Sequence, residues 1–386
     1  MKILHTSDWH IGKVVNDFSL IEDQAFFLDG LCALISQETP DVVLISGDLY
    51  DRSIPPTEAI KLLDKTLSKI VCELQTKVFA ISGNHDSPTR LSFGTSLLEK
   101  QGLVIKTEHK KEMEKITLRD EFGEVNFYFL PFVESVYLKR DFENETFSSL
   151  NDVFNRYIEY NGENIDKNSR NVLLAHGFFS TLDKEKALKD SIFSASETSV
   201  GACDLINAQK ISELFDYAAL GHLHAAQKVA ENVRYSGSIL KYSDSETSQN
   251  KSVTIVELNE KNNVQIRTVK IPTLRDMRRV IGTFEEVSKN EKSDDYVFVT
   301  LTDETYIMDA SNKLRNIYPN LMGVNFTCLE KENDLSEVNA QILREKTTQE
   351  LFLDFYKSIM PSQMNDEQQQ IMDRIIKISQ KGEGEE

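Results

Sequence analysis

The chain opens with the stretch Met1-Lys2-Ile3-Leu4-His5-Thr6-Ser7-Asp8-Trp9-His10, which decides the fold. Residues 2–6 predict a short strand, and the polar Asp8 and His10 follow where that strand ends. Two similar strands are expected over 41–46 and 77–82, each ending in a short polar loop that contains Asp, His or Asn. Strands that alternate with helices predict an α/β domain. Active sites of such sheets gather at the carboxyl ends of the strands, so these loops predict chemistry.

The rest of the first 271 residues extends this pattern. The elements expected there are helices over 19–37, 55–73 and 148–160, a hairpin over 115–130, and strands over 171–175 and 215–220. From 227 to 270 the pattern changes to short alternating strands, which we expect to form a second sheet. The predicted architecture is therefore α/β, with two packed β-sheets flanked by helices.

Two further parts are expected after the catalytic domain, which we assign to 1–271. Ile271-Pro272-Thr273 marks a boundary, and 275–329 repeats strand, helix, strand, helix, strand as a small α+β module. Residues 338–386 contain two helices, because Thr347 to Glu350 has the sequence of a capping box and Pro361 ends the helix that follows it.

Five short polar motifs fall at predicted strand ends. They are Asp8-Trp9-His10, Gly47-Asp48, Gly83-Asn84-His85-Asp86, His176-Gly177 and Gly221-His222-Leu223-His224. Residues two apart on the extension of a strand project to the same side, as Asp8 and His10 do, and as His222 and His224 do. Each motif alone is a weak signal, whereas five in this order favour one metal site.

The residue types in these motifs suit metal ions. Mixed carboxylate, imidazole and amide ligands fit manganese, iron or zinc better than magnesium. One carboxylate, Asp48, can bridge two ions ~3.5–4 Å apart, the separation used by two-metal hydrolases. Glycines beside the ligands allow tight turns and close backbone approach.

Several residues near these motifs are open to a plainer interpretation. Trp9 is expected to pack beside the site, and His5 and His109 to be structural. Phe178 and Phe179 either line a substrate cleft or pack within a loop.

The four cysteines show no CxxC spacing, so buried free thiols are expected rather than disulfides or a zinc site.

Together the five motifs resemble the calcineurin-like metallophosphoesterases. More narrowly, Lys2 to Gly12, Gly47-Asp48-Leu49-Tyr50-Asp51-Arg52 and Gly83 to Ser87 look like the bacterial SbcD family of exonuclease subunits. The resemblance covers essentially the whole chain. This chain differs from archaeal and eukaryotic members of the family, which often have a second histidine where it has Asp51 and Arg52.

The resemblance implies a role for each motif residue. Asp8, His10, Asp48 and His224 would hold one divalent ion, and Asp48, Asn84, His176 and His222 the other, with manganese as the expected metal. His85 would stand near the scissile phosphate and stabilise the transition state or protonate the leaving oxygen, and Asp86 would orient its ring. The implied activity is two-metal hydrolysis of phosphodiesters by a DNA nuclease, an exonuclease on duplex ends and an endonuclease on single strands or hairpins, acting in repair, recombination and replication.

The resemblance also implies partners. The 275–329 module would be a capping domain that grips DNA, with Arg275, Arg278 and Arg279 as candidate phosphate contacts, unless they lie on a solvated helix face. The two C-terminal helices would bind the coiled coil of an SbcC-type ATPase, in a heterotetramer with two copies of each protein, or would pack back on the catalytic domain. A homodimer through 57–71 and 88–100 is expected.

Composition limits the class of protein. The hydrophobic fraction of 40% and charged fraction of 27% are ordinary for a globular protein, and no apolar run approaches the ~20 residues that span a bilayer. The polar N-terminus is not expected to be a signal peptide, so we expect a cytoplasmic protein without a membrane partner. The net charge of −18 argues against a nucleic-acid binder, but two bound cations or a partner protein could offset it.

Two other functions remain open at this point. The first is a metallophosphoesterase that acts on a small phosphodiester, a nucleotide or a phosphoprotein, which would share every ligand but would have no use for the capping module and the C-terminal helices. The second is a metal-binding scaffold without catalysis, which the complete ligand set and His85 argue against.

Overall fold

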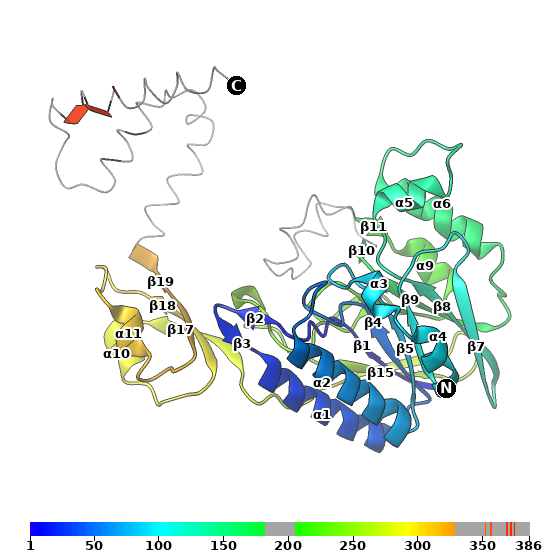
Figure 1. Cartoon of the computed structure of the whole chain (residues 1–386), viewed down its shortest axis with the longest axis horizontal. Coiled ribbons are helices and arrows are strands. Elements are labelled where there is room, and N and C mark those ends of the chain that lie inside the picture. The colour runs from blue at the N-terminus through cyan, green and yellow to red at the C-terminus, as the bar shows by residue number, and fades with distance from the viewer. Residues whose placement is uncertain are drawn as a thin grey trace. The chain divides into compact units, whose positions relative to one another are not determined.

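The computed structural model describes residues 1–181 and 205–328, together with Phe352, Tyr356, Gln368, Gln369, Ile371, Met372 and Arg374. The chain divides into two compact units (Figure 1). The first unit is Met1–Val280, Glu291–Val299 and Leu314–Gly323, and the second is Ile281–Asn290, Thr300–Lys313 and Val324–Glu386. The predicted boundary at 271–275 stays a prediction, because this division falls later in the chain.

A six-stranded sheet in the order β16-β15-β1-β4-β5-β6 forms one layer of the first unit. Its strands are β1 (Lys2–Thr6), β4 (Val42–Ser46), β5 (Lys77–Ile81), β6 (Leu103–Lys106), β15 (Val253–Leu258) and β16 (Val264–Val269). The first four are parallel to one another, and β15 joins β1 antiparallel. Strands β1, β4 and β5 are almost fully buried, and β4 and β5 are mostly apolar, as expected for strands covered on both faces.

A second six-stranded sheet has the order β13-β14-β12-β9-β8-β7. Its strands are β7 (Glu114–Asp120), β8 (Gly123–Leu130), β9 (Arg170–His176), β12 (Tyr217–Gly221), β13 (Gln227–Ala230) and β14 (Val233–Tyr235). The hairpin β7–β8 confirms the one predicted over 115–130. Two short strand pairs also belong to this unit: β2 (Val14–Val15) with β3 (Phe18–Ser19), and β10 (Phe179–Ser180) with β11 (Ile206–Asn207).

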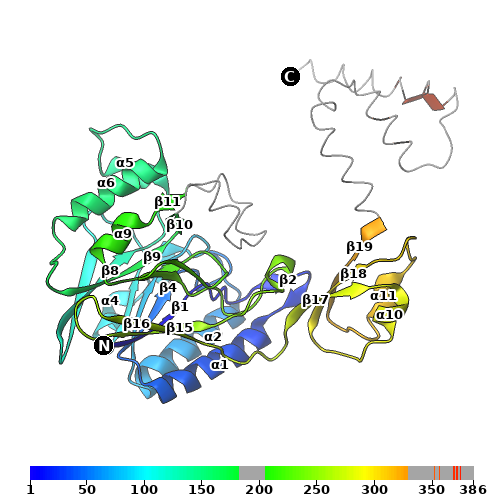
Figure 2. The ribbon, with the colours of Figure 1, turned by 180° about the vertical axis from the view of Figure 1, so that it is seen from behind.

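Helices cover the outer faces of both sheets (Figures 1 and 2). On the first sheet lie α1 (Ile21–Glu38) and α2 (Thr57–Ser68), which continues into the π-helical turn η1 (Lys69–Glu73). On the second lies α6 (Leu150–Gly162), which begins with a capping box between Ser149 and Asp152. The shorter helices are α3 (Pro88–Leu91), α4 (Thr95–Leu98), η2 (Glu99–Gln101), α5 (Ser135–Arg140), α9 (Gln209–Leu214) and η3 (Asp244–Glu246).

The two sheets pack face to face over an apolar core. Phe79 of β5 meets Phe127 of β8 edge to face, with ring centroids 5.1 Å apart. Two more buried clusters fill the spaces between each sheet and its helices. The predicted sandwich of two sheets flanked by helices is therefore confirmed.

One expectation about the sheets is wrong. The strands between 227 and 270 do not form a sheet of their own: β13 and β14 extend the second sheet, whereas β15 and β16 extend the first. Sequence alternation identifies which face of a strand is buried, but the neighbour of that strand depends on long-range pairing, here between β15 and β1 across about 250 residues.

The predicted strand-helix-strand-helix-strand module is present after residue 275. Strands β17 (Met277–Gly282), β18 (Tyr296–Leu301) and β19 (Leu321–Phe326) form a sheet in chain order, with α10 (Phe284–Ser288) and α11 (Ala310–Leu314) between them. A capping box between Thr283 and Glu286 begins α10. The two predicted C-terminal helices lie mostly outside the described residues.

Cys32, Cys72 and Cys328 are free thiols, and Cys203 lies outside the described residues. Cys32 is buried as expected, but Cys72 is exposed on η1. In the part of the chain that the structure describes, no helix is both long and apolar enough to cross a lipid bilayer.

Candidate metal centre

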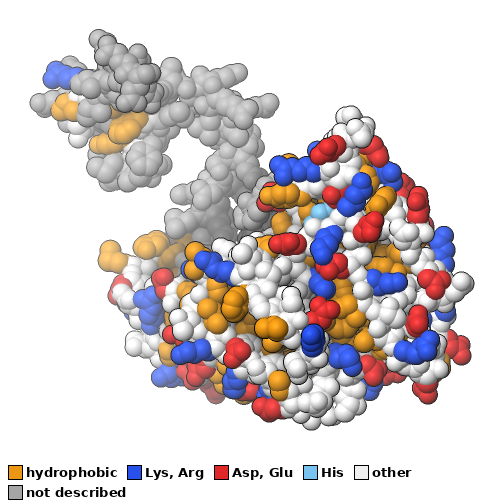
Figure 3. Space-filling model, turned by 45° about the vertical axis from the view of Figure 1, so that its right-hand side comes forward, with side chains coloured by type: hydrophobic (Ala, Val, Ile, Leu, Met, Phe, Trp, Pro, Cys, Tyr) orange, Lys and Arg blue, Asp and Glu red, His pale blue; other side chains and the backbone are white. Residues whose placement is uncertain are grey.

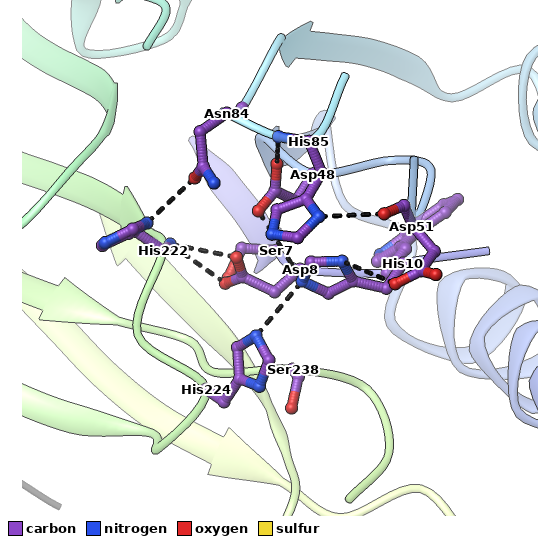
Figure 4. A network of polar contacts seen from close by, with 12 residues as sticks. Ser7, Asp8, His10, Asp48, Asp51, Asn84, His85, His222, His224 and Ser238 are labelled. Atoms are coloured by element: carbon purple, nitrogen blue, oxygen red, sulfur yellow. Dashed lines mark hydrogen bonds and ion pairs between the residues drawn. The ribbon is translucent and has the colours of Figure 1, made fainter. Parts of the chain in front are cut away.

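The five polar motifs come together at the carboxyl ends of strands from both sheets, and Figure 4 shows labelled residues from four of them. Asp8 and His10 follow β1, Asp48 follows β4, and Asn84 and His85 follow β5 in the first sheet. His176 is the last residue of β9, and His222 and His224 follow β12 in the second sheet. The polar contacts that join these motifs span up to 214 positions in the sequence. The site thus lies where the two layers meet.

The backbone of four of these residues lies in the left-handed region. The φ angles are 52° at Asp8, 44° at His10, 50° at Asp48 and 112° at His222. Such conformations cost about 1–3 kcal/mol each in residues other than glycine and persist only where surrounding contacts fix them. Here the amide of Asp8 donates to the carbonyl of Gly47 at 3.1 Å, and the amide of His10 donates to that of Asp48 at 2.9 Å.

The first predicted ligand group is assembled. Ligand atoms of Asp8, His10 and His224 all lie within 4.8 Å of one another. The Nε2 atoms of His10 and His224 face each other at 3.1 Å, and Nε2 of His10 lies 3.6 Å from Oδ2 of Asp48. All four side chains are buried.

The second predicted ligand group is assembled beside it. Oδ1 of Asn84 lies 3.0 Å from Nε2 of His176 and 3.0 Å from Nδ1 of His222. Nε2 of His176 is 3.5 Å from Oδ2 of Asp48, so the Asp48 carboxylate lies within 3.6 Å of a histidine from each group. This is the placement expected of a bridging ligand.

Hydrogen bonds on the far side of two rings decide which nitrogen is available. Nδ1 of His176 donates to the carbonyl of Ser46 at 2.8 Å, and Nδ1 of His224 pairs with Oε1 of Glu246 at 3.0 Å. Both rings therefore present Nε2 to the centre. Fixing the tautomer by a contact on the other nitrogen is usual for metal-ligating histidines.

The buried charges of the site strongly shift its pKa values. Burial raises the pKa of Asp8 to about 6 and lowers the pKa of His222 to about 3. Burial would also lower the pKa of His176, but the carboxylates of Asp48 and Asp8 outweigh it and raise that pKa to about 9. The pKa of Asp48 is held well below its usual range, because His176, His10 and His85 outweigh the effect of its burial.

A pair of divalent cations fits this donor set. Buried carboxylate oxygens, one amide oxygen and four imidazole rings converge on one centre, and Nδ1 of His10 makes no hydrogen bond within the described residues. Cations would compensate the buried carboxylates and favour the neutral imidazoles.

His85 lies at the edge of both groups. Its ring centroid is 4.7 Å from that of His10, and its amide donates to Oδ1 of Asp48 at 2.8 Å. Its Nδ1 pairs with the backbone carbonyl of Asp51 at 2.9 Å.

The expectation that Asp86 contacts the His85 ring is wrong for the contacts that the structure describes. The Asp86 carboxylate instead accepts three backbone N–H groups, from Gly83 at 2.9 Å, Tyr50 at 3.0 Å and Leu49 at 3.1 Å. Burial and the nearby Asp48 charge raise the pKa of Asp86 to about 7. Asp86 therefore connects the loop after β5 to the loop after β4. The group that contacts Nδ1 of the His85 ring is the backbone carbonyl of Asp51.

The three arginines proposed for DNA contact all have carboxylate partners in the first unit. Arg275 pairs with Glu22 and Asp23, Arg278 with Asp295, and Arg279 with Asp244. Arg278 and Arg279 belong to strand β17, so the alternative of a solvated helix face is wrong.

Three residues of the site were not found by sequence reasoning. The Asp51 carboxylate lies 3.8 Å from Nδ1 of His10 and 2.8 Å from Nζ of Lys13. Glu246 lies behind His224 and pairs with Lys251 at 2.6 Å. The signal for Asp51 was its place in the Gly47 to Arg52 motif, whereas Glu246 and Lys251 lie in a polar loop with no distinguishing pattern.

Trp9, His5 and His109, which were expected to have structural roles, contact residues outside the candidate ligand groups. Trp9 is fully buried and donates from Nε1 to Thr6, His5 pairs with Tyr217 at 2.8 Å, and His109 pairs with Asp141 at 2.5 Å. Phe178 and Phe179 are buried in the core beside the second sheet, which favours the packing interpretation over a cleft lining.

Comparison with known proteins gives two family matches. Residues 1–226 match the model described as calcineurin-like phosphoesterase, and residues 273–359 match the one described as type 5 capsule protein repressor C-terminal domain.

Two curated relatives are similar over the full length. The chain is 30% identical over 392 residues to the D subunit of the SbcCD nuclease of Staphylococcus epidermidis, covering 100% of each chain. It is 30% identical over 384 residues to that of Staphylococcus saprophyticus, covering 97% of this chain and 98% of the relative. A solved structure of TT1561 from Thermus thermophilus covers 70% of this chain and 99% of its own at 12% identity, with a TM-score of 0.38.

Proposed function

The chain belongs to the calcineurin-like phosphoesterases and, within them, to the SbcD family of nuclease subunits, and we propose on that premise that it is a two-metal DNA nuclease. One observation carries the chemistry. Seven side chains from five separate strand ends converge, and the carboxylate of one of them, Asp48, lies between two groups of ligands.

The proposed metals are two divalent ions, with manganese as the expected metal. Asp8, His10, Asp48 and His224 would hold one ion, and Asp48, Asn84, His176 and His222 the other. Ions bound there would lower the pKa of a water and neutralise charge on the phosphate, which is how two-metal hydrolases act.

His85 is the proposed acid of the site. Because Nδ1 pairs with the Asp51 carbonyl, Nε2 is the nitrogen left to face a substrate. From there the ring can donate a hydrogen bond to a phosphate oxygen or a proton to the leaving oxygen. The hydrogen bond that its backbone N–H donates to the Asp48 carboxylate keeps His85 next to the proposed bridging ligand.

DNA is the proposed substrate, with exonuclease activity on duplex ends and endonuclease activity on single strands or hairpins. The face in Figure 3 mixes acidic and basic side chains, so attraction to DNA would come from the bound ions, the 275–329 module and the partner rather than from that face. Arg278 and Arg279 are half-exposed and remain candidate phosphate contacts, although DNA would first have to displace Asp295 and Asp244.

An SbcC-type ATPase is the proposed partner, bound through the two C-terminal helices in a complex with two copies of each protein. The match of residues 273–359 to a C-terminal domain model supports this assignment over a metallophosphoesterase that acts on small substrates alone. A protein that works on chromosomal DNA would act in the cytoplasm of a bacterium.

A second copy of the chain is the proposed neighbour of the α3–α4 patch, formed by Phe93, Leu97 and Leu98. The exposed fractions of these side chains are 89%, 76% and 40%. Apolar side chains gathered this way mark interaction surfaces. The patch lies within the 88–100 segment expected from the sequence to form a dimer.

The test compares wild type with His85→Ala and His109→Ala on end-labelled duplex DNA in the presence of Mn²⁺. Wild type should degrade the DNA, His85→Ala should lose about 10²–10⁴-fold in rate with its metal content unchanged, and His109→Ala should retain the rate. Intact DNA together with hydrolysis of a small phosphodiester by wild type would favour the alternative, a metallophosphoesterase for small substrates. Failure on both substrates would contradict the proposal.

A further inference from the structure

A buried ion pair stands directly behind one candidate metal ligand. Glu246, at the end of η3, is 0% exposed, and its Oε1 lies 3.0 Å from Nδ1 of His224. Its other oxygen, Oε2, accepts from Nζ of Lys251 at 2.6 Å, and the Lys251 side chain is 5% exposed. Nothing in the proposed hydrolysis uses either residue.

The pair is held from several sides. Nζ of Lys251 also donates to the backbone carbonyl of His224 at 2.9 Å and to Oγ of Ser238 at 2.8 Å. Ser243 donates to Oε1 of Glu246 at 3.0 Å, and the amide of Ser238 donates to the His224 carbonyl at 3.1 Å. Lys251 therefore fixes the main chain of His224 and, through Glu246, its ring.

Two of the other candidate ligands, His10 and His176, have weaker support behind Nδ1. His176 has a neutral backbone carbonyl behind Nδ1, and the nearest carboxylate oxygen to Nδ1 of His10 is that of Asp51 at 3.8 Å. A full carboxylate hydrogen-bonded to the far nitrogen of an imidazole makes the metal-facing nitrogen more basic and fixes the tautomer. Of these three histidines, His224 therefore has the strongest electron donation behind it.

We propose that Glu246, kept in place by Lys251, is a positioning residue that sets the affinity of the ion bound by His224. This inference rests on the proposed function, because it takes the two-ion site as given. Its specific content is an asymmetry: loss of the Glu246 charge weakens the ion held by Asp8, His10, Asp48 and His224 and leaves the ion on His176 and His222 in place.

The main test measures Mn²⁺ binding by equilibrium dialysis and metal analysis of the full chain. Glu246→Gln keeps the size and an acceptor oxygen but removes the charge. The matched control is Asp216→Asn, because the Asp216 side chain is also 0% exposed and also pairs with a lysine, Lys261, at 2.7 Å. Asp216 precedes β12, at the opposite end of that strand from His222.

We expect wild type to bind two ions, Glu246→Gln to bind one of them about 10–100-fold more weakly, and Asp216→Asn to bind both as wild type does. Unchanged binding in Glu246→Gln, equal weakening of both sites, or the same loss in Asp216→Asn would overturn the inference. If wild type itself bound no metal, the result would contradict the proposed function rather than this inference alone.

A second measurement needs no variant of Glu246. In the metal-free wild type with ¹⁵N-labelled histidine, the His224 ring should carry its proton on Nδ1, with its signals identified by their loss in His224→Gln. A proton on Nε2 would overturn the inference.

Discussion

His176 illustrates at the residue scale how buried charge is balanced in the metal-free site. Its ring is buried, which disfavours the proton, yet Asp48 and Asp8 hold that proton in place and raise its pKa to about 9. The protonated ring stands in for a cation beside the carboxylates. Metal binding must therefore displace a proton.

The metal-free protein should become less stable between pH 7 and pH 9. In that window the folded chain keeps a proton on His176, whereas the unfolded histidine, with a pKa of about 6.5, has lost it. The stability due to this group is fully present below pH 6.5 and is lost as the pH rises through about 9. The thermal midpoint measured with a chelator should fall as the pH rises from 7 to 9. The increase in thermal midpoint on adding Mn²⁺ should become larger over the same range. A thermal midpoint that rises with pH in the presence of the chelator would contradict the raised pKa of His176.

Asp86 gives a second prediction at this scale. Replacing it by alanine leaves the amides of Leu49, Tyr50 and Gly83 without an acceptor. We expect a loss of roughly 3 kcal/mol in the free energy of unfolding, since each buried unsatisfied group costs ~1–3 kcal/mol. Chemical denaturation measures this, with Glu108→Ala as a control at an exposed acid. A change under ~0.5 kcal/mol would show that these amides find other partners.

At the element scale, the strands and helices were predictable because each is coded locally. The apolar runs of β1, β4, β5 and β9 were found within one or two residues, and so were the polar motifs at their ends. The sheet partner of β15 was not predictable, because it depends on a pairing with β1 from the other end of the domain. Glu246 was missed for the same reason, since its contact with His224 comes from tertiary folding.

The turn after β5 leads to a prediction about a glycine. A Cβ added to Gly83 would lie 2.1 Å from Oδ1 of Asp48 and 2.5 Å from its backbone nitrogen. Gly83→Ala should therefore shift the proposed bridging ligand, lower metal content and destabilise the chain by about 1–3 kcal/mol. Metal analysis and thermal unfolding measure this. The control is Gly323→Ala, where the new Cβ would meet Phe298 at an ordinary 3.8 Å; equal effects of the two changes would contradict the argument.

At the scale of the whole molecule, the chemistry and the assembly are expected to use different surfaces. The candidate ligands lie at the carboxyl ends of strands from both sheets, whereas the α3–α4 patch is exposed. Changes on one surface should therefore leave the other intact.

The proposed dimer should separate when the patch is charged. Phe93→Glu places a carboxylate on a side chain that is 89% exposed, so the monomer fold should survive while association is lost. Light scattering after size-exclusion chromatography measures the mass. Phe122→Glu, at the tip of the β7–β8 hairpin, is the control and should keep the mass of wild type. A dimeric Phe93→Glu would place the contact elsewhere.

The C-terminal helices should be dispensable for the hydrolysis itself. A chain that ends at residue 329 keeps every candidate ligand and His85, so it should still hydrolyse bis(p-nitrophenyl) phosphate with Mn²⁺. It should fail to co-purify with an SbcC-type coiled coil that retains the full chain. Co-purification of the shortened chain would mean that the partner binds another surface.

The division of the ligands between the two sheets has a consequence for the folding pathway. Neither sheet by itself can complete either ligand group, since Asp8, His10, Asp48 and Asn84 come from one layer and His176, His222 and His224 from the other. Tight metal capture should therefore be a late kinetic event, after both layers have formed and docked. Metal uptake during refolding would therefore report the docking of the two layers, whereas the formation of either sheet alone would leave no complete ligand group.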